Sequence, residues 1–533
     1  MSRLRTFLQR LEQKDGGSIG QAALLLAVAS VASRILGVLR DRLLATTFGA
    51  GLELDAYYAA FRLPDTLYNL VIIGALSAGF LPLLAELKAK KGAESSMRFA
   101  SLVFGWFAVA LIALAVIGSL FAPQIVPLMV TGFDGERLAL TVRLTRWLFL
   151  SPFLLGVSAI FGGVLQSARK TLAFAFAPVV YNIGILFGIV ALVPLLGVLG
   201  VVVGVLLGAA LHALLQYRGA FRLGLRWPEQ LVWTPDLRRL FVLTAPRLAS
   251  LGAAQISLVL LLGFASVLPE GSVAVFQLGN NLQSFPLGVI GISFALAAFP
   301  LLSDAAGNGD WQAYHDVLGE TGRRIVYFLL PVSLLFVLLR AQLVRLILGD
   351  GAFNWDATIA TAQVVGWMSI SLVFQALAPL LARAFYALQS TWTPFIVTGI
   401  TEALMILAAF FLRSNFGIAG LAMAFSGAAI LQVVLLWIAL RRRAGAASER
   451  SFLRLVVCSL VASVPALVVA AGLRQVVGTV FPLHTVWQVA LQFGVSAGGA
   501  GVVYLGVTQM MHLAEAEVLW RRIRSLTGRR ASI

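Results

Sequence analysis

Long apolar runs, separated by short polar connections, follow one another from residue 21 to residue 511. A helix needs roughly 20 apolar residues to cross the hydrocarbon core of a bilayer, and most of these runs reach that length. The pattern predicts about fourteen transmembrane helices. They cover 21–48, 55–87, 99–121, 138–166, 172–194, 198–217, 239–268, 272–302, 324–348, 357–388, 392–412, 416–440, 452–473 and 485–511. The expected fold class is therefore an all-α integral membrane protein.

Similar sequence recurs in the two halves of the chain. Phe61-Arg-Leu in the second run corresponds to Phe276-Gln-Leu in the eighth, and Gly197-x-x-Gly200 in the sixth corresponds to Gly417-x-x-Gly420 in the twelfth. A constant separation of about 220 residues is typical of a duplicated unit. Because each unit holds six spans, the two copies have the same orientation. The pattern predicts two six-helix lobes related by a parallel repeat, followed by two additional C-terminal helices.

The repeat and the connections divide the chain into six expected segments. These are a cytoplasmic amphipathic lead-in (1–18), an N-lobe (19–217), a cytoplasmic linker (218–238), a C-lobe (239–441), the two extra helices (442–512) and a basic cytoplasmic tail (513–533). Lys and Arg gather in the even-numbered connections and at both ends of the chain, whereas the odd-numbered connections are acidic or neutral. Since Lys and Arg are retained in the cytoplasm, both termini are expected there.

Composition supports a membrane protein and argues against other classes. Hydrophobic residues make up 60% of the chain and charged residues 12%, which is too little polar surface for a soluble protein. The net charge of +17 would suggest nucleic acid binding in a soluble protein, but these basic residues lie beside membrane spans and face anionic lipid headgroups instead. No catalytic or metal-binding motif occurs, and no connection is long enough for an ATPase or hydrolase domain, so an enzyme is not expected.

The first two predicted helices carry charges inside otherwise apolar runs. Charge at membrane depth is costly unless it faces a wet cavity or a partner, so it marks a candidate functional site. Asp55 and Arg62 lie on one face of the second helix, and Arg34 and Asp41 on one face of the first. The charges either neutralise one another as the intrahelical pairs Arg34–Asp41 and Arg62–Asp65 or line a common cavity. The candidate substrate-binding residues of this region are Arg34, Arg40, Asp41, Asp55 and Arg62.

The second lobe is polar rather than charged at the matching place. Asn280, Asn281 and Gln283 are further candidates for substrate binding, because amides can recognise sugar hydroxyls and amides; the alternative is that they hold helices together. Glu402 is the only acid deep in the eleventh predicted helix and is the candidate for coupling to Na⁺ or H⁺. No other cofactor is expected.

Several motifs resemble the lipid II flippases known as MurJ or MviN, of the multidrug/oligosaccharidyl-lipid/polysaccharide exporter superfamily. They are Ser33-Arg34-Ile-Leu-Gly37-x-x-Arg40-Asp41, Phe61-Arg-Leu-Pro64 and Phe285-Pro-x-Gly288, within a six, six, two arrangement that spans the chain. The resemblance implies alternating access around a cationic cavity. Undecaprenyl-diphosphate-linked disaccharide-pentapeptide would pass from the inner to the outer leaflet of the bacterial inner membrane for peptidoglycan synthesis. Arg34, Arg40 and Asp55 would correspond to required residues, with the arginines binding the diphosphate, and the two extra helices would form a groove for the lipid tail.

The chain departs from the family pattern at three places. Tyr68-Asn69 and Ile73 stand where the family usually has arginine and glutamate, and Asn281 stands where it has arginine. The chain is therefore either a divergent lipid II flippase or a relative with another cargo, namely another polyprenyl-diphosphate glycan or a drug exported with a cation. A third alternative is a transport-inactive membrane scaffold for cell-wall synthesis proteins. Drug exporters usually lack the two extra helices and the arginine pair, which favours the flippase.

Overall fold

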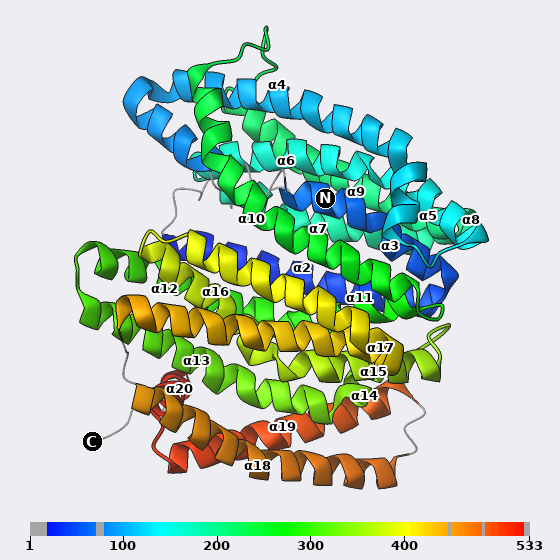
Figure 1. Ribbon diagram of the computed structural model, residues 1–533, viewed down its shortest axis with the longest axis vertical. Coiled ribbons are helices and arrows are strands. Elements are labelled where there is room, and N and C mark those ends of the chain that lie inside the picture. Colours follow the sequence, from blue (N-terminus) through cyan, green and yellow to red (C-terminus); the bar gives the residue numbers. More distant parts are fainter. Residues whose placement is uncertain (1–18, 71–78, 446–448, 482–484, 527–533) are drawn as a thin grey trace. The chain divides into compact units, whose positions relative to one another are not determined.

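The computed structural model describes residues 19–70, 79–445, 449–481 and 485–526, and these residues are almost entirely helical (Figure 1). The expected lead-in (1–18), the position Ile73 and the end of the basic tail lie outside the described residues. Contacts divide the chain into two compact units, Met1–Ala274 and Val275–Ile533. Within the described ranges no strand occurs. The all-α membrane fold class is thus confirmed.

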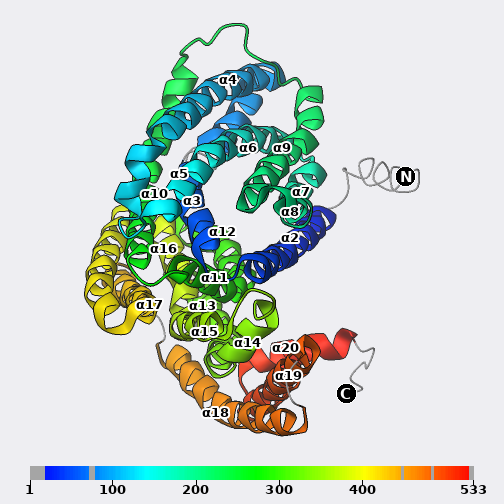
Figure 2. The ribbon, with the colours of Figure 1, turned by 90° about the vertical axis from the view of Figure 1, so that its right-hand side faces the viewer.

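The first unit runs from α2 to the start of α11. Its elements are α2 (Ile19–Phe48), α3 (Leu52–Tyr68), α4 (Leu81–Met129), α5 (Gly135–Leu148), α6 (Leu150–Ser167), α7 (Thr171–Phe187), the π-turn η2 (Gly188–Leu192), α8 (Val193–Leu196), α9 (Val198–Arg222), α10 (Pro235–Ser266) and the start of α11 (Ser272–Pro286). Helix α9 packs on both α6 and α7, and α2 lies against α7 (Figure 2). Helix α3 packs on α5, and α4 on α6.

Glycines bring α7 and α9 into backbone contact. A Cβ atom at Gly184 would lie 2.3 Å from the Cα atom of Gly208, and one at Gly188 would lie 2.6 Å from the Cα atom of Gly204. No side chain fits at these distances. Small residues one turn apart are the usual means by which membrane helices approach this closely, because lipid supplies no hydrophobic force between them. This contact fixes the side chains that α7 and α9 present to the interior of the unit.

The second unit ends in an antiparallel helix pair. Its elements are the rest of α11, η3 (Leu287–Gly291), α12 (Ile292–Gly307), α13 (Trp311–Leu338), α14 (Arg340–Ile347), α15 (Trp355–Ile370), α16 (Leu372–Ala387), α17 (Trp392–Ala444), α18 (Glu449–Val480), α19 (Val486–Met510) and α20 (Ala514–Leu526). Helices α18 and α19 lie side by side, and α13 packs on α18 (Figures 1 and 2). Buried Tyr314 and Tyr327 of α13 and Phe385 of α16 belong to the hydrophobic core that these helices share with α18 and α19.

The predicted spans fall on helices wherever the structure describes them. By length and apolar character, nine of the described helices could cross a membrane, or ten if the pair α15 and α16, bent by 45°, is one span. This number is below fourteen partly because α17 holds two predicted spans, joined at the non-helical Gly417. In addition, α2, α3 and α10 are not among the nine helices, because they carry charges or adjoin residues outside the described part.

Backbone conformation reproduces the internal repeat. Glycines with positive φ recur about 220 residues apart in the five pairs Gly49 and Gly271, Gly92 and Gly309, Gly135 and Gly351, Gly197 and Gly417, and Gly224 and Gly445. The two non-glycine residues Arg169 (φ 58°) and Gln389 (φ 55°) keep the same separation. His512, with φ 52°, lies beyond the repeated part. The same left-handed turns therefore end the same helices in both copies, which confirms the duplication expected from the sequence.

The division by contacts differs from the expected lobe boundary. Helix α9 ends at Arg222 and α10 begins at Pro235, so the connection between them falls within the expected linker 218–238. Contacts with α3 and α4, however, group α10 with the first unit. The assignment of α10 to a C-lobe, like the other segment boundaries, stays a prediction.

Candidate functional site

A cavity of about 290 Å³ lies within the first unit. It is lined by residues of α2, α3, α6, α7 and α9, and its polar lining consists of Arg40, Asp65, Tyr68, Ser151, Tyr181 and His212. Pro64, Pro152 and Pro178 also line it. A proline inside a helix leaves the carbonyl one turn earlier without its backbone donor, and membrane helices tolerate this where the carbonyl faces a cavity or a neighbouring polar group.

Arg40 brings the cationic charge to this cavity. Its Nε and Nη2 atoms both donate to Asp41 Oδ1, at 3.0 and 2.8 Å. The exposed fractions of the two side chains are 26% and 8%. A guanidinium has five N–H donors in a planar fork, and the pair with Asp41 uses two of them. The remaining donors of Arg40 are available to a ligand in the cavity.

Asp65 lines the same cavity, whereas Arg62 is directed elsewhere. Asp65 accepts a hydrogen bond from Asn69 Nδ2 at 3.0 Å. Arg62 Nη2 donates to Gln255 Oε1 of α10 at 2.9 Å, and its Nε is buried without an acceptor in the described part of the chain. Arg62 and Asp65 therefore do not form the intrahelical ion pair that was the alternative to a cavity.

His212 is held by a buried hydroxyl and an amide. Ser158 Oγ lies 2.7 Å from His212 Nδ1 and accepts from Gln216 Nε2 at 2.8 Å. Ser158 is fully buried, so its hydroxyl proton needs an acceptor, and Nδ1 is the one in reach. This arrangement makes the neutral imidazole carry its proton on Nε2. The sequence alone does not identify His212 as a site residue, because its partner Ser158 lies 54 residues away on another helix.

Asp55 lies at the centre of a second group of polar contacts, at the beginning of α3. Its side chain is fully buried and forms an ion pair with Arg137 of α5. The same carboxylate accepts from the backbone N–H of Gly271 at 2.8 Å and of Ala274 at 2.7 Å. In return Glu270 Oε1 accepts from the N–H of Leu52 at 2.9 Å. Each helix start is thus capped by a carboxylate from the other chain segment, which satisfies N–H groups that have no partner within their own helix.

Arg137 is a residue that the sequence interpretation missed. Its guanidinium lies over the Phe133 ring, 3.7 Å from the ring centre, and its side chain is 11% exposed. The sequence did contain a signal. Arg137 belongs to an odd-numbered connection, whereas Lys and Arg otherwise gather in the even-numbered ones. A basic residue outside the connections predicted to be cytoplasmic is a reason to search for a buried acid.

The amide candidates of the second unit form a hydrogen-bonded network. Gln283 is 1% exposed, and its Nε2 is 3.2 Å from Asn280 Oδ1 and 3.3 Å from Gln375 Oε1 of α16. Asn281 Oδ1 accepts from Gln277 Nε2 at 2.9 Å. The bond to Gln375 joins α11 to α16, as expected of a residue that holds helices together, whereas the other two bonds lie within α11. Substrate recognition by Asn280, Asn281 and Gln283 stays a prediction.

The remaining candidates lie apart from the cavity lining. Arg34 is partly buried on α2 and makes no hydrogen bond or ion pair with another described residue. Its neighbour Ser33 is held by Asn182 Nδ2, 3.1 Å from Ser33 Oγ. Glu402 is partly buried in α17. Among the described side chains, no three His, Cys, Asp or Glu residues gather closely enough to hold a metal ion. Among the described charged residues of α2 and α3, Arg40 and Asp65 are therefore the two that line the cavity.

Comparison with known families identifies relatives along most of the chain. The family model described as "Lipid II flippase MurJ" matches residues 44–490. A "Probable lipid II flippase MurJ" from Rhizobium tropici is 30% identical over 450 residues, which are 82% of this chain and 83% of that protein.

Solved structures show the same fold. "Lipid II flippase MurJ, inward closed conformation" superposes with a TM-score of 0.77 at 23% identity, over 92% of this chain and 99% of that one. An inward-facing multidrug resistance transporter of the MATE family, in the MOP superfamily, has a TM-score of 0.69 at 16% identity, over 78% of this chain and 96% of that one. At these identities the likeness concerns the fold.

Proposed function

Since the chain belongs to the MurJ family of lipid II flippases, we propose that it carries lipid II, a polyprenyl-diphosphate-linked disaccharide-peptide, across the bacterial cytoplasmic membrane by alternating access. The direction is from the inner to the outer leaflet, and both termini lie in the cytoplasm. The distribution of Lys and Arg among the connections supports this orientation.

The observation that carries the proposal is the partly exposed guanidinium of Arg40 in a cavity formed by α2, α3, α6, α7 and α9. Arginine keeps its charge when desolvated and matches phosphate oxygens bidentately. Liquid water occupies about 30 Å³ per molecule, so a cavity of about 290 Å³ has room for a phosphate group but not for a disaccharide with its peptide. Arg40 therefore binds the diphosphate, while the sugars and peptide lie outside this cavity.

His212 supplies a second donor to the same phosphate. The bond from Ser158 to Nδ1 leaves Nε2–H as the hydrogen-bond donor of a ring that lines the cavity. A neutral donor adds a hydrogen bond without adding a second buried charge, which would be costly. Asp65 is negatively charged and therefore repels a phosphate on its side of the cavity. Its carboxylate accepts hydrogen bonds from hydroxyl groups instead.

Transport also needs two states with different affinity for the lipid, because a ligand that binds both equally shifts nothing. The contacts around Asp55 hold the starts of α3 and α11 together in one of these states. Glu402 is the group through which Na⁺ or H⁺ couples to the change of state.

Complementation tests this proposal. The chain is expressed in a bacterium depleted of its own lipid II flippase, and lipids that purify with it are identified by native mass spectrometry. We expect growth with the wild type, with lipid II bound, and no growth with Arg40→Ala. Arg146→Ala, an exposed arginine of α5, is the matched control and should support growth. A different polyprenyl-diphosphate glycan in place of lipid II would show another cargo, and loss of growth with no bound lipid would indicate the scaffold.

A further inference from the structure

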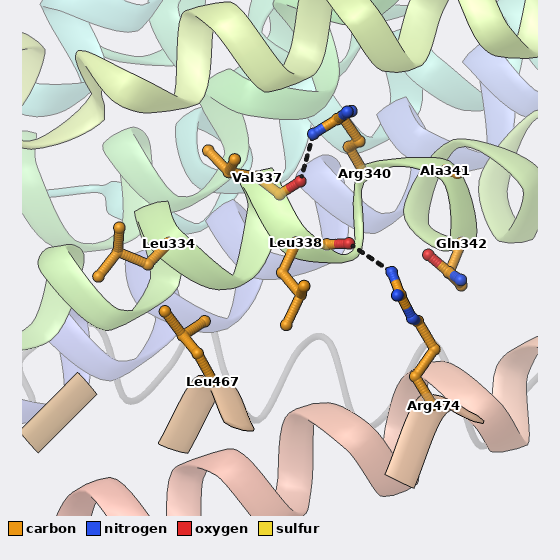
Figure 3. Close-up of a pocket in the computed structure, with 8 residues that line it drawn as sticks. All are labelled: Leu334, Val337, Leu338, Arg340, Ala341, Gln342, Leu467 and Arg474. Carbon is orange, nitrogen blue, oxygen red and sulfur yellow. Dashed lines mark hydrogen bonds between the residues drawn. The ribbon is translucent and has the colours of Figure 1, made fainter. Parts of the chain in front are cut away.

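A second hollow, of about 450 Å³, lies in the second unit where α13 and α14 meet α18 (Figure 3). Its residues differ entirely from those around Arg40. One end is apolar, with Leu334 and Leu338 of α13 facing Leu467 of α18. The other end is polar, with Gln342 of α14 and Arg474 of α18. Leu467 and Arg474 lie about two turns apart on the same face of α18.

Arg474 caps the end of α13 and keeps donors to spare. Its Nη1 donates to the carbonyl of Leu338 at 3.3 Å, where α13 ends and leaves carbonyls without helical partners. No carboxylate in the described part of the chain lies within ion-pair distance of Arg474. Arg340 also lines the hollow but turns its guanidinium to the other side, toward the Val337 carbonyl (Figure 3). Arg474 is therefore the cation that faces the hollow.

Gln342 adds an unsatisfied acceptor beside this cation. Its Oε1 is buried, and no hydrogen-bond donor among the described residues reaches it. Figure 3 shows its amide on the same side of α14 as the guanidinium of Arg474. A buried acceptor without a donor costs free energy, so the site is complete only when a ligand supplies an N–H or O–H group.

The two ends together match a phospholipid. A lone guanidinium at the end of an apolar span is best neutralised by a lipid phosphate, which is anionic and offers several acceptor oxygens. A phosphate diester has no donor for Gln342, whereas glycerol and ethanolamine headgroups both have one. The ethanolamine is an ammonium and would place a second cation beside Arg474, but the glycerol hydroxyls are neutral. We propose that this hollow binds phosphatidylglycerol. The phosphate accepts from Arg474, a headgroup hydroxyl donates to Gln342 Oε1, and an acyl chain lies along Leu334, Leu338 and Leu467. The bound lipid holds α18 against α13 and α14.

Native mass spectrometry of the full chain in detergent tests this site, after removal of its lipids. Phosphatidylglycerol, phosphatidylethanolamine and undecaprenyl phosphate are added at equal amounts. We expect phosphatidylglycerol to bind best, and Arg474→Gln to weaken it about tenfold, the effect of one charge-assisted hydrogen bond. Gln removes the charge but keeps a polar amide at this position. Arg454→Gln, an exposed arginine of the same helix, should bind as the wild type does.

A second variant distinguishes the contribution of the headgroup hydroxyl from that of the phosphate charge. Gln342→Leu should abolish the preference for phosphatidylglycerol over phosphatidylethanolamine while leaving charge-dependent binding in place. Equal binding of the two phospholipids by the wild type, preference for undecaprenyl phosphate, or binding unchanged by Arg474→Gln would each overturn the proposal. Since these measurements require no transport, they are independent of the outcome of the complementation experiment.

Discussion

Asp55 and Arg137, 82 residues apart in the sequence, form an ion pair in which the carboxylate is fully buried and the arginine is 11% exposed. The pair joins α3 to α5, and the two backbone N–H groups at Gly271 and Ala274 bind the same carboxylate. One acid therefore compensates one cation and caps one helix start. Its removal should affect the fold as well as transport.

Asp55→Asn should lower the free energy of unfolding by about 3–5 kcal/mol, because Arg137 is then left buried without a counter-ion. The melting temperature of the purified protein in detergent measures this effect. Glu53→Gln, an exposed acid in the same helical turn, should leave the melting temperature unchanged.

The double variant Asp55→Asn with Arg137→Gln distinguishes the ion pair from the cap. Removing both charges should cost less than the sum of the two single changes, since no lone buried charge remains. Strict additivity of the three melting experiments would mean that the two side chains do not interact.

Ser158→Ala should disturb the imidazole of His212. Without the hydroxyl, Nδ1 keeps only the long contact to Gln216 Nε2 at 3.4 Å. Both neutral tautomers then become populated, so we expect a loss of activity of about tenfold, equal to one hydrogen bond. The chain holds four histidines, so ¹⁵N spectra of histidine-labelled protein can resolve the change. The wild type should show the proton on Nε2. Ser167→Ala, whose hydroxyl donates to the Val164 carbonyl in the same helix, is the control. A wild-type spectrum with the proton on Nδ1 would contradict the assignment.

Alanine scanning of glycines should give opposite results at two positions. Gly188→Ala places a methyl group 2.6 Å from the Cα atom of Gly204 and should lower the melting temperature by separating the π-turn after α7 from α9. Gly494→Ala in α19 meets no atom within 4 Å and should leave the melting temperature equal or higher, because alanine favours the helix. A loss of stability at Gly494 alone would be inconsistent with the described packing.

Glu402→Gln should remove the dependence of transport on the coupling ion. Glutamine keeps the shape of the side chain but has no charge for Na⁺ and no site for a proton. Transport rates are compared under imposed sodium and proton gradients in reconstituted vesicles. If the wild type and the variant respond identically to both gradients, Glu402 has no part in coupling.

The fold could be predicted from the sequence because membrane spans and duplication leave local signals. Apolar length identifies helices, and matching residues such as Gly197 and Gly417 recur with the same backbone conformation. The cavity was only partly predictable. Arg40 stood out as charge within an apolar run, whereas His212 did not, because its role depends on Ser158 of another helix.

The role of Asp55 shows the limit of helical-wheel reasoning. The wheel placed Asp55 and Arg62 on one face, but Asp55 binds Arg137 and Arg62 binds Gln255. Periodicity gives the face of an isolated helix, while the neighbour that covers each turn is set by tertiary packing. Arg137, a basic residue outside the connections predicted to be cytoplasmic, was the one sequence signal of this partner.

Our central claim is that Arg40 binds the diphosphate of lipid II during its passage across the membrane. The most direct test is the amount of lipid II accessible from outside the cytoplasmic membrane, measured in cells that depend on this chain. We predict high accessibility with the wild type, a loss of at least tenfold with Arg40→Ala and partial recovery with Arg40→Lys, which retains charge but not the planar fork. Equal accessibility with the wild type and Arg40→Ala, at equal amounts of protein in the membrane, would contradict the claim.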